Sequence, residues 1–229
     1  YCVSFFFLHR VVSFEPPREE AQRGLVLGGV RFIAASPVVR SALAATATLN
    51  IFDYAFLALF VLYVTRSLGL SPGTLGLVLG AGAVGGVIGS LLTGRIARSI
   101  GVGPTFAAGC LVFPLPLLLV PLAGGPQSIV LLMLLAAEFG AGFGVMMLDI
   151  SIGSIFAATI PDRFRSRVSG AYMMVNYGVR PLGALAAGAL ATTIGTRETL
   201  ILAAAGGGLG VLWLVRSPLL RMRDLPEPE

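Results

Sequence analysis

Four charged residues lie inside long apolar stretches of the sequence, where a charge is costly. Three are acids (Asp53, Glu138 and Asp149) and one is a base, Arg180. A charged side chain near the centre of a bilayer costs about 2.5 to 3.5 kcal/mol on insertion scales, so each of these residues needs a partner or a function. The excess of acids over bases predicts a site that binds a cation or carries a proton.

Helical spacing places these acids on faces shared with other polar groups. Glu138 and Asp149 are eleven residues apart, which at 100° per residue puts both on one face of a helix. Asn50 and Asp53 share a face at i, i+3 spacing. We expect these faces to line a cavity; the alternative is that they form hydrogen bonds between helices.

A third polar stripe contains the one base. Tyr172, Asn176 and Arg180 follow each other at i, i+4, i+8 spacing, so all three lie on one helix face. Arg180 and Asp149 also fall at similar depths on consecutive antiparallel helices, which favours an ion pair between them. Two alternatives remain open: a role of both residues at a transport site, and a neutral, protonated Asp149.

The composition indicates an integral membrane protein. Of 229 residues, 56% are hydrophobic and only 12% are charged, and the mean hydropathy is +0.90. A soluble domain usually has about a quarter charged residues, and scarce charge, two cysteines and 30 glycines exclude a disordered chain, a disulfide scaffold and a coiled coil. All 16 basic residues are arginines that lie mostly between apolar stretches, which argues against nucleic-acid binding.

No other chemistry competes with this interpretation. His9 is the only histidine, so neither a catalytic triad nor a histidine metal site can form. The sequence contains no phosphate-binding loop or dinucleotide fingerprint, and Cys2 and Cys110 are expected to be reduced, small hydrophobic residues. We therefore expect no catalytic residue, no metal and no cofactor, and a protein that is not an enzyme.

Six segments are long and apolar enough to cross a membrane. They are approximately Ser41–Val64, Pro72–Ile96, Pro104–Leu122, Ser128–Thr159, Val168–Thr193 and Thr199–Val215. The predicted domains are the end of a transmembrane helix (1–8), a cytoplasmic linker (9–40), a six-helix transmembrane domain (41–216) and a cytoplasmic tail (217–229). Within the linker, Leu25–Ile33 fits either a short helix on the inner leaflet or a solvated segment.

The arginines predict the orientation. Thirteen arginines fall in alternate gaps between the spans and in the flanking segments, whereas only Arg66 and Arg197 lie in the other gaps. Positive charge is enriched on the cytoplasmic side of membrane proteins. We therefore expect a multi-pass protein of the cell membrane whose C-terminus is cytoplasmic.

Glycines and prolines indicate how the spans pack. The second span carries glycines at small-xxx-small spacing, such as Gly76 with Gly80 and Gly82 with Gly86, which predicts close helix contacts. The third span contains three prolines, which predict a kink; they are Pro114, Pro116 and Pro121.

The order of parts resembles the C-terminal half of a major facilitator superfamily transporter, with a cytoplasmic linker followed by six helices. Four stretches are similar to the enterobactin-exporter-like branch of drug and siderophore efflux proteins. They are RGLVLGGVRFIAASPVVR (Arg23–Arg40), IPDRFRSRVSGAY (Ile160–Tyr172), RPLGALAAGAL (Arg180–Leu190) and RSPLLRMRDLPEP (Arg216–Pro228). The resemblance implies that residues 1–8 end helix six and that the spans are helices seven to twelve.

The resemblance also identifies cytoplasmic loop motifs. In the family the loop after the second helix of each half reads G-x-L-A-D-R-x-G-R-R, and here Gly94, Arg95 and Gly101 keep its frame. Arg98 replaces the aspartate and Ser99 the arginine, so the charge relay of that loop is altered in this half. The second motif contributes Asp162, Arg163 and Arg167.

Helices seven and ten line the central cavity in this family, and Asp53 and Asp149 fall on them. The resemblance thus implies that Asp53 and Asp149 couple transport to protons or cations. Glu138 is a further candidate for this coupling because it is the third acid within the apolar stretches. Arg180 is then a counter-ion that changes partners between states. The remaining polar residues of these helix faces are expected to contact the substrate; they are Asn50, Tyr172 and Asn176.

The expected function is secondary active transport, as proton-coupled efflux of a small molecule such as a drug or siderophore by alternating access. The expected partners are the substrate, the lipid bilayer and a missing N-terminal six-helix half, with no nucleic acid. Two alternatives remain: a membrane subunit of another permease class driven by an ATPase, and a non-transporting fragment or membrane scaffold.

Overall fold

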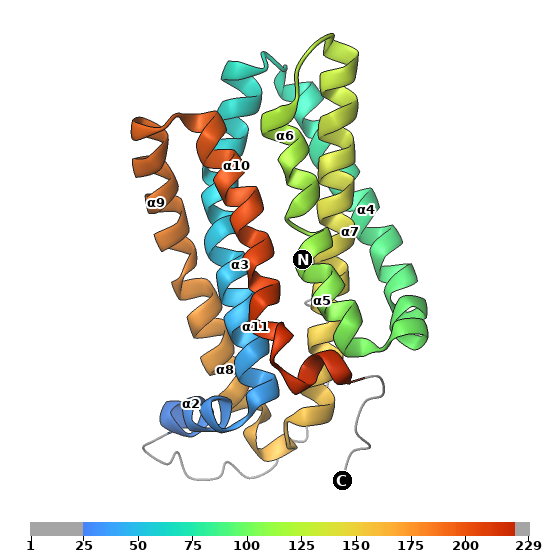
Figure 1. Ribbon diagram of the computed structural model, residues 1–229, viewed down its shortest axis with the longest axis vertical. Helices are drawn as coiled ribbons and strands as arrows, with labels where there is room; N and C mark the ends of the chain where they lie inside the picture. Colours follow the sequence, from blue (N-terminus) through green and yellow to red (C-terminus); the bar gives the residue numbers. More distant parts are fainter. Residues whose placement is uncertain (1–24, 223–229) are drawn as a thin grey trace, which may run out of the picture.

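The computed structural model describes residues 25–222, and within them every regular element is a helix. The long helices run lengthwise in one bundle, and the short α2 lies across its lower end (Figure 1). The main helices are α2 (Leu25–Ala35), α3 (Pro37–Leu62), α4 (Pro72–Ile100), α5 (Val102–Val112), α6 (Leu119–Leu122), α7 (Gln127–Thr159), α8 (Asp162–Gly178), α9 (Arg180–Thr193), α10 (Thr196–Gly207) and α11 (Leu212–Val215).

Five of the six predicted spans form helical segments long and apolar enough to cross a membrane. They are Pro37–Ser67, Pro72–Ile100, Val102–Leu122, Gln127–Thr159 and Thr196–Val215. The first continues α3 through the π-helix η1 (Tyr63–Ser67), and the last joins α10 to α11 through η3 (Gly208–Val211). These segments confirm an all-α membrane fold.

The remaining predicted span, 168–193, is not one helix. It consists of α8 and α9, which follow one another along the side of the bundle with a break at Val179 (Figure 1). The cause is Pro181, which has no N–H to donate and whose ring clashes with the carbonyl four residues before it. Together the two helices still run the length of the bundle.

Several gaps between the predicted spans are shorter in the structure. Ile160 and Pro161 alone separate α7 from α8, so most of the gap between the predicted spans that end at Thr159 and start at Val168 is the first part of α8. Gly101 separates α4 from α5 with φ +98°, a conformation that favours glycine. The first span also starts earlier than predicted, because Ser36 caps α3 by accepting the Val39 N–H at 3.4 Å.

The third span is interrupted at its prolines, as predicted. After α5 the chain passes through Pro114 into the 3₁₀-helix η2 (Leu115–Leu118) and then into α6. Pro116 lies in the first turn of η2, where a missing N–H is tolerated.

Glycines bring α4 and α7 into direct backbone contact. A Cβ on Gly85 would collide with the carbonyl of Phe139, and a Cβ on Gly142 would collide with that of Gly82. Close contact was predicted for α4, but Gly76 and Gly80 face open space. The other predicted pair, Gly82 and Gly86, does face α7: a Cβ on Gly82 would lie 3.3 Å from Glu138 Oε2, and one on Gly86 would lie 3.7 Å from the Gly142 carbonyl oxygen.

The helices form two groups. One group contains α3 packed against α9 and α10, and the other contains α7 packed against α4 and α5. Contacts between α3 and α7 are sparse by comparison. Side chains of α3, α7 and α8 therefore line a space between the two groups.

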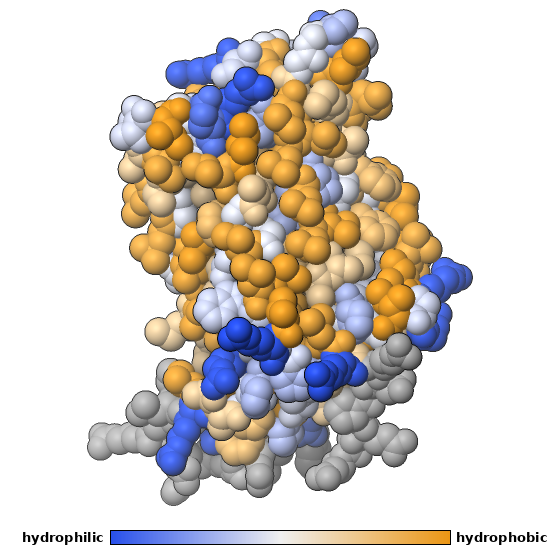
Figure 2. Space-filling model, in the orientation of Figure 1, coloured by the Kyte–Doolittle hydropathy of each residue, from blue (hydrophilic) through white to orange (hydrophobic). Residues whose placement is uncertain are grey.

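The surface has the distribution expected of a membrane protein. Large apolar side chains are exposed along the bundle, including Leu77, Leu91, Leu132 and Leu185, each at least 66% exposed. Hydrophilic residues gather towards the two ends of the visible face (Figure 2). This apolar middle band fits contact with lipid.

The helical alternative for residues 25–33 is the one observed, since α2 covers Leu25–Ala35 and packs against α8. Gly29 permits this contact, because a Cβ there would meet the Arg167 backbone. The predicted helix end at 1–8, the start of the linker with His9, Cys2 and the end of the tail lie outside the described residues. Cys110 is a free thiol that is fully buried.

The glycine contact between α4 and α7 predicts a stability difference. Gly85→Ala should lower the free energy of unfolding by about 1 to 3 kcal/mol, because the new methyl group overpacks the interface with the Phe139 backbone. Gly80→Ala is the matched control, since Gly80 faces open space and alanine favours helix. Chemical unfolding in detergent measures both; equal stability of the two variants would contradict the packing argument.

Candidate functional site

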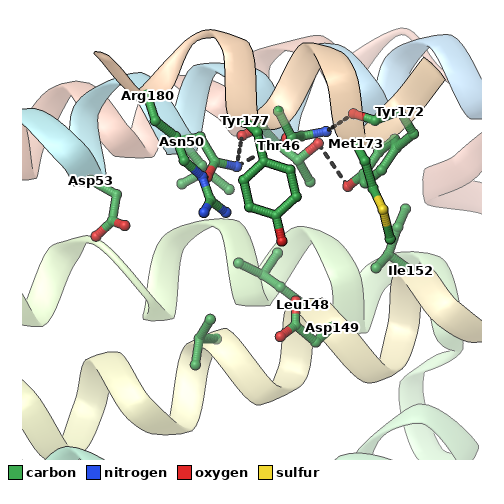
Figure 3. A pocket seen from close by; sticks show the side chains of 13 residues that line it. Thr46, Asn50, Asp53, Leu148, Asp149, Ile152, Tyr172, Met173, Tyr177 and Arg180 are labelled. Carbon is green, nitrogen blue, oxygen red and sulfur yellow. Dashed lines mark hydrogen bonds between the residues drawn. The ribbon is translucent and has the colours of Figure 1, made fainter. Parts of the chain in front are cut away.

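A cavity of about 340 Å³ lies between the two helix groups, midway along α3 and α7. Figure 3 shows side chains from α3, α8 and α9 on one wall and from α7 on the other. The lining residues are Thr46, Leu49, Asn50, Asp53, Val145, Leu148, Asp149, Ile152, Tyr172, Met173, Asn176, Tyr177 and Arg180. The exposed side chains of Asp149, Met173 and Tyr177 show that the cavity opens at the surface of the bundle.

Three polar pairs connect α3 to α8 and α9. Tyr172 donates its hydroxyl to Thr46 Oγ1 at 2.9 Å, and Asn50 Nδ2 donates to Asn176 Oδ1 at 2.9 Å. The third pair joins the Arg180 guanidinium to the Tyr54 hydroxyl at 2.8 Å. We call these three pairs the polar ladder.

The polar ladder follows from matching helical periods. Each pair is separated by 126 residues in sequence, so successive pairs advance by four residues on both sides. Such a constant offset requires parallel helices in fixed register. Thr46 and Asn176 are buried, and polar groups in an apolar interior need hydrogen-bond partners, which the facing stripe provides.

Arg180 is held on several sides by neutral groups. Besides the Tyr54 hydroxyl, its Nε donates to Asn50 Oδ1 at 2.9 Å. Its guanidinium carbon lies 4.1 Å from the Tyr177 ring centre and 4.6 Å from the Tyr54 ring centre, which is the distance of cation–π contacts.

The predicted ion pair between Arg180 and Asp149 is not formed. Among the side chains that the structure describes, the one ion pair joins Arg165 and Asp162 at 2.7 Å, and both of these side chains are exposed. Arg180 and Asp149 were matched in depth, but they project from opposite walls of the cavity (Figure 3). Depth along a helix does not fix the direction of the side chain, and the Asn50 and Tyr54 stripe of α3 is closer to Arg180.

The three acids occupy different positions. Asp53 on α3 and Asp149 on α7 both line the cavity, and neither makes a hydrogen bond or ion pair within the described residues. Asp53 lies close enough to Arg180 and to Glu138 for its charge to interact with theirs. Glu138 does not line the cavity: it lies three turns from Asp149, beside Gly82 of α4.

The predicted loop motif residues lie mostly on helices. Gly94, Arg95 and Arg98 belong to the last turns of α4, where both arginines are exposed, and Gly101 ends that helix. Asp162, Arg163 and Arg167 belong to α8. A charged stretch between apolar spans can be either a loop or the polar end of a helix, and the sequence alone does not distinguish the two.

The sequence analysis did not identify eight residues of the site. Four are polar, aromatic or sulfur-containing (Thr46, Tyr54, Met173 and Tyr177) and four are aliphatic (Leu49, Val145, Leu148 and Ile152). The signal for two of them was present, because Thr46, Asn50 and Tyr54 repeat the i, i+4, i+8 spacing of the stripe that ends at Arg180. Within the described residues, no group of three or more His, Cys, Asp or Glu side chains could hold a metal ion.

These features define an all-α membrane protein with a polar cavity between its helices that opens at the surface of the bundle. The family model of the Major Facilitator Superfamily matches residues 43–229, and the chain therefore belongs to this superfamily of membrane transporters, whose members are not enzymes. No curated protein and no solved structure matches the chain significantly.

The polar ladder predicts unequal effects of its two asparagines. Asn50→Ala should destabilise the protein more than Asn176→Ala, because Asn50 loses bonds to both Asn176 and Arg180. In a double-mutant cycle the two should couple by about 0.6 kcal/mol, the usual value between membrane helices.

Unfolding in detergent measures these differences. Thr192→Ala is the control, since its hydroxyl bonds only to the Ala189 carbonyl of its own helix, and it should change stability by less than about 0.5 kcal/mol. Equal effects of the two asparagine variants without coupling would show that the ladder does not hold the helices together.

Proposed function

We propose that the chain is the C-terminal six-helix half of a secondary transporter that exports a small molecule, such as a drug or siderophore, in exchange for protons. The observation that carries the proposal is the cavity between the helix groups, with two acids, Asp53 and Asp149, on facing walls. The choice of branch rests on the four stretches of sequence that resemble enterobactin-exporter-like proteins. Transport proceeds by rocking of one half against the other around this cavity.

The two acids are the proposed proton or cation sites. Neither Asp53 nor Asp149 is neutralised by an ion pair within the described residues, although both lie midway along membrane-spanning helices. A buried or cavity-facing acid without a fixed partner can gain and release a proton during the transport cycle. Glu138 acts on this site indirectly, because it is within electrostatic range of Asp53 but does not line the cavity.

Arg180 and the polar ladder form the opposite side of the proposed site. Arg180 lies within electrostatic range of Asp53 without an ion pair, so it serves as a counter-ion that is free to change partners. Asn50, Tyr172 and Asn176 line the same cavity and are the proposed substrate contacts.

A second six-helix half is the proposed partner. The cavity opens at a surface where Asp149, Met173 and Tyr177 are exposed, and a charged group facing lipid at this depth would be unfavourable. A second half that covers this opening would enclose the cavity. The stability of such a complex would then depend on the exposed faces of α8 and α9.

Charge removal at the two acids tests the proposal. Asp149→Asn and Asp53→Asn should each reduce pH-gradient-driven efflux at least tenfold, because an amide cannot exchange a proton. The measurement uses membrane vesicles that contain this chain joined to its upstream half, with a panel of ethidium, Nile red and fluorescein.

The controls separate coupling from folding. Glu198→Gln removes an exposed acid at the start of α10, outside the cavity, and should transport like the wild type. Glu138→Gln should have a smaller effect than either cavity variant. If both aspartate variants insert normally and transport like the wild type, the acids only pack the helices and the proposed coupling is wrong.

We also propose that the arginine-rich end of the bundle faces the cytoplasm. Arg95 and Arg98 are exposed at the end of α4, whereas Arg66 lies in η1, which follows α3 at the opposite end of the bundle. Enrichment of arginine on one side supports this orientation.

Reporter fusions test the orientation. A green fluorescent protein joined after Glu229 should fluoresce, because it folds in the cytoplasm, and alkaline phosphatase inserted after Gly125 should be active, because it requires export. Gly125 lies in the exposed turn before α7. The reverse pattern of fluorescence and phosphatase activity would invert the proposed topology.

A further inference from the structure

Arg180 uses only part of its hydrogen-bonding capacity within the protein. Its Nε donates to Asn50, and one Nη donates to the Tyr54 hydroxyl. A guanidinium has five N–H donors, so these two bonds leave three without a hydrogen-bond partner among the described residues. The terminal nitrogens point into the cavity, towards the α7 wall (Figure 3).

Two tyrosine rings restrict the position of the guanidinium. The ring centres of Tyr54 and Tyr177 lie 4.6 and 4.1 Å from the guanidinium carbon, so both rings pack against it. We call the N–H groups that are not bonded to Asn50 or Tyr54 the open edge of Arg180. Together with the Asn50 bond, these contacts hold the side chain in one orientation. A ligand that binds this edge therefore does not have to order the arginine first.

No acid of the cavity occupies the open edge. Asp53 is within electrostatic range of Arg180 but forms no ion pair with it, and Asp149 projects from the opposite wall. The planar guanidinium fork matches the two oxygens of a carboxylate, and such paired, charge-assisted hydrogen bonds are stronger than those between neutral groups. The N–H donors that Arg180 does not use within the protein can therefore bind an anionic group.

We propose that the molecule bound in this cavity carries an anionic group, a carboxylate, which binds the open edge of Arg180. This inference rests on the proposed function, because it names the substrate class of the same cavity.

The other lining residues define the rest of that molecule. Leu49, Val145, Leu148 and Ile152 provide an apolar surface, so the body of the substrate is apolar. Asp149 on the facing wall repels a second negative charge at the far end. The substrate class is accordingly a small organic acid with one carboxylate and an apolar body that fits a cavity of about 340 Å³.

Matched acids and amides test the inference by direct binding, without transport. The purified full chain in lipid nanodiscs is titrated with 2-naphthoate against 2-naphthamide, and with octanoate against octanamide, while its thermal unfolding is followed. Each pair differs only in the charged group. The acid should bind at least tenfold more tightly than the amide of at least one pair.

Variants assign this preference to Arg180. Arg180→Gln should remove the preference for the acid, whereas Arg180→Lys should keep part of it, because lysine retains the charge but lacks the planar fork. Arg66→Gln is the control, since Arg66 is exposed outside the cavity, and it should bind both acids like the wild type.

A second measurement does not depend on the folding of the variants. Phenylglyoxal modifies arginine side chains, and mass spectrometry maps the modification at Arg180 in the wild type. The bound acid should slow modification of Arg180 at least fivefold, whereas the amide should leave it unchanged. Binding of neither acid, equal binding of acid and amide, or unchanged modification of Arg180 would overturn the inference.

The outcome is distinguishable from failure of the proposed function. Carboxylate binding at Arg180 without gradient-driven efflux would reject the coupling mechanism and keep the anion site. Gradient-driven efflux without a preference for acids would reject the anion site and keep the coupling mechanism.

Discussion

An arginine midway along apolar helices has to find its partners inside the protein, because the hydrocarbon core of a bilayer offers neither hydrogen-bond acceptors nor counter-ions. Arg180 meets this requirement through Asn50, the Tyr54 hydroxyl and two aromatic rings. These contacts bind the start of α9 to α3, and the Asn50–Asn176 and Thr46–Tyr172 pairs extend the connection along α8. The register of α3 against the broken span α8–α9 therefore depends on solvating one cation with neutral groups.

The second group of helices obeys a different constraint. Between α4 and α7 the contact is made by backbone, at Gly85, Gly89 and Gly142, where any side chain would separate the helices. Small residues allow dispersion contacts over a large area, which is the main attraction available between helices in lipid. One group is thus held by polar pairs and the other by close backbone packing. The cavity lies between the two groups of helices, and its lining includes acidic groups that take part in neither kind of contact.

Much of this arrangement could be predicted from the sequence, and the failures have identifiable causes. Five spans were located to within a few residues, because apolar length and the helix-starting residues Ser36 and Ser71 are local signals. The division of the fifth span, 168–193, at Val179 was missed, although Pro181 was visible in the sequence. The predicted partner of Arg180 was also wrong. Depth was estimated along one helix, whereas pairing depends on the rotation of two helices about their axes.

The membrane class, the apolar segments and the helical spacing of the polar stripes could be predicted from the sequence, because each depends on residues close together in the chain. The need of a few charges for partners could also be predicted. The identity of those partners depends on how the helices pack. Asn50 and Asn176 are 126 residues apart, and nothing local relates the face of α3 to that of α8. Packing sets that relation. As a result Arg180 donates to neutral acceptors, whereas Asp53 and Asp149 line the cavity without an ion pair to any described residue.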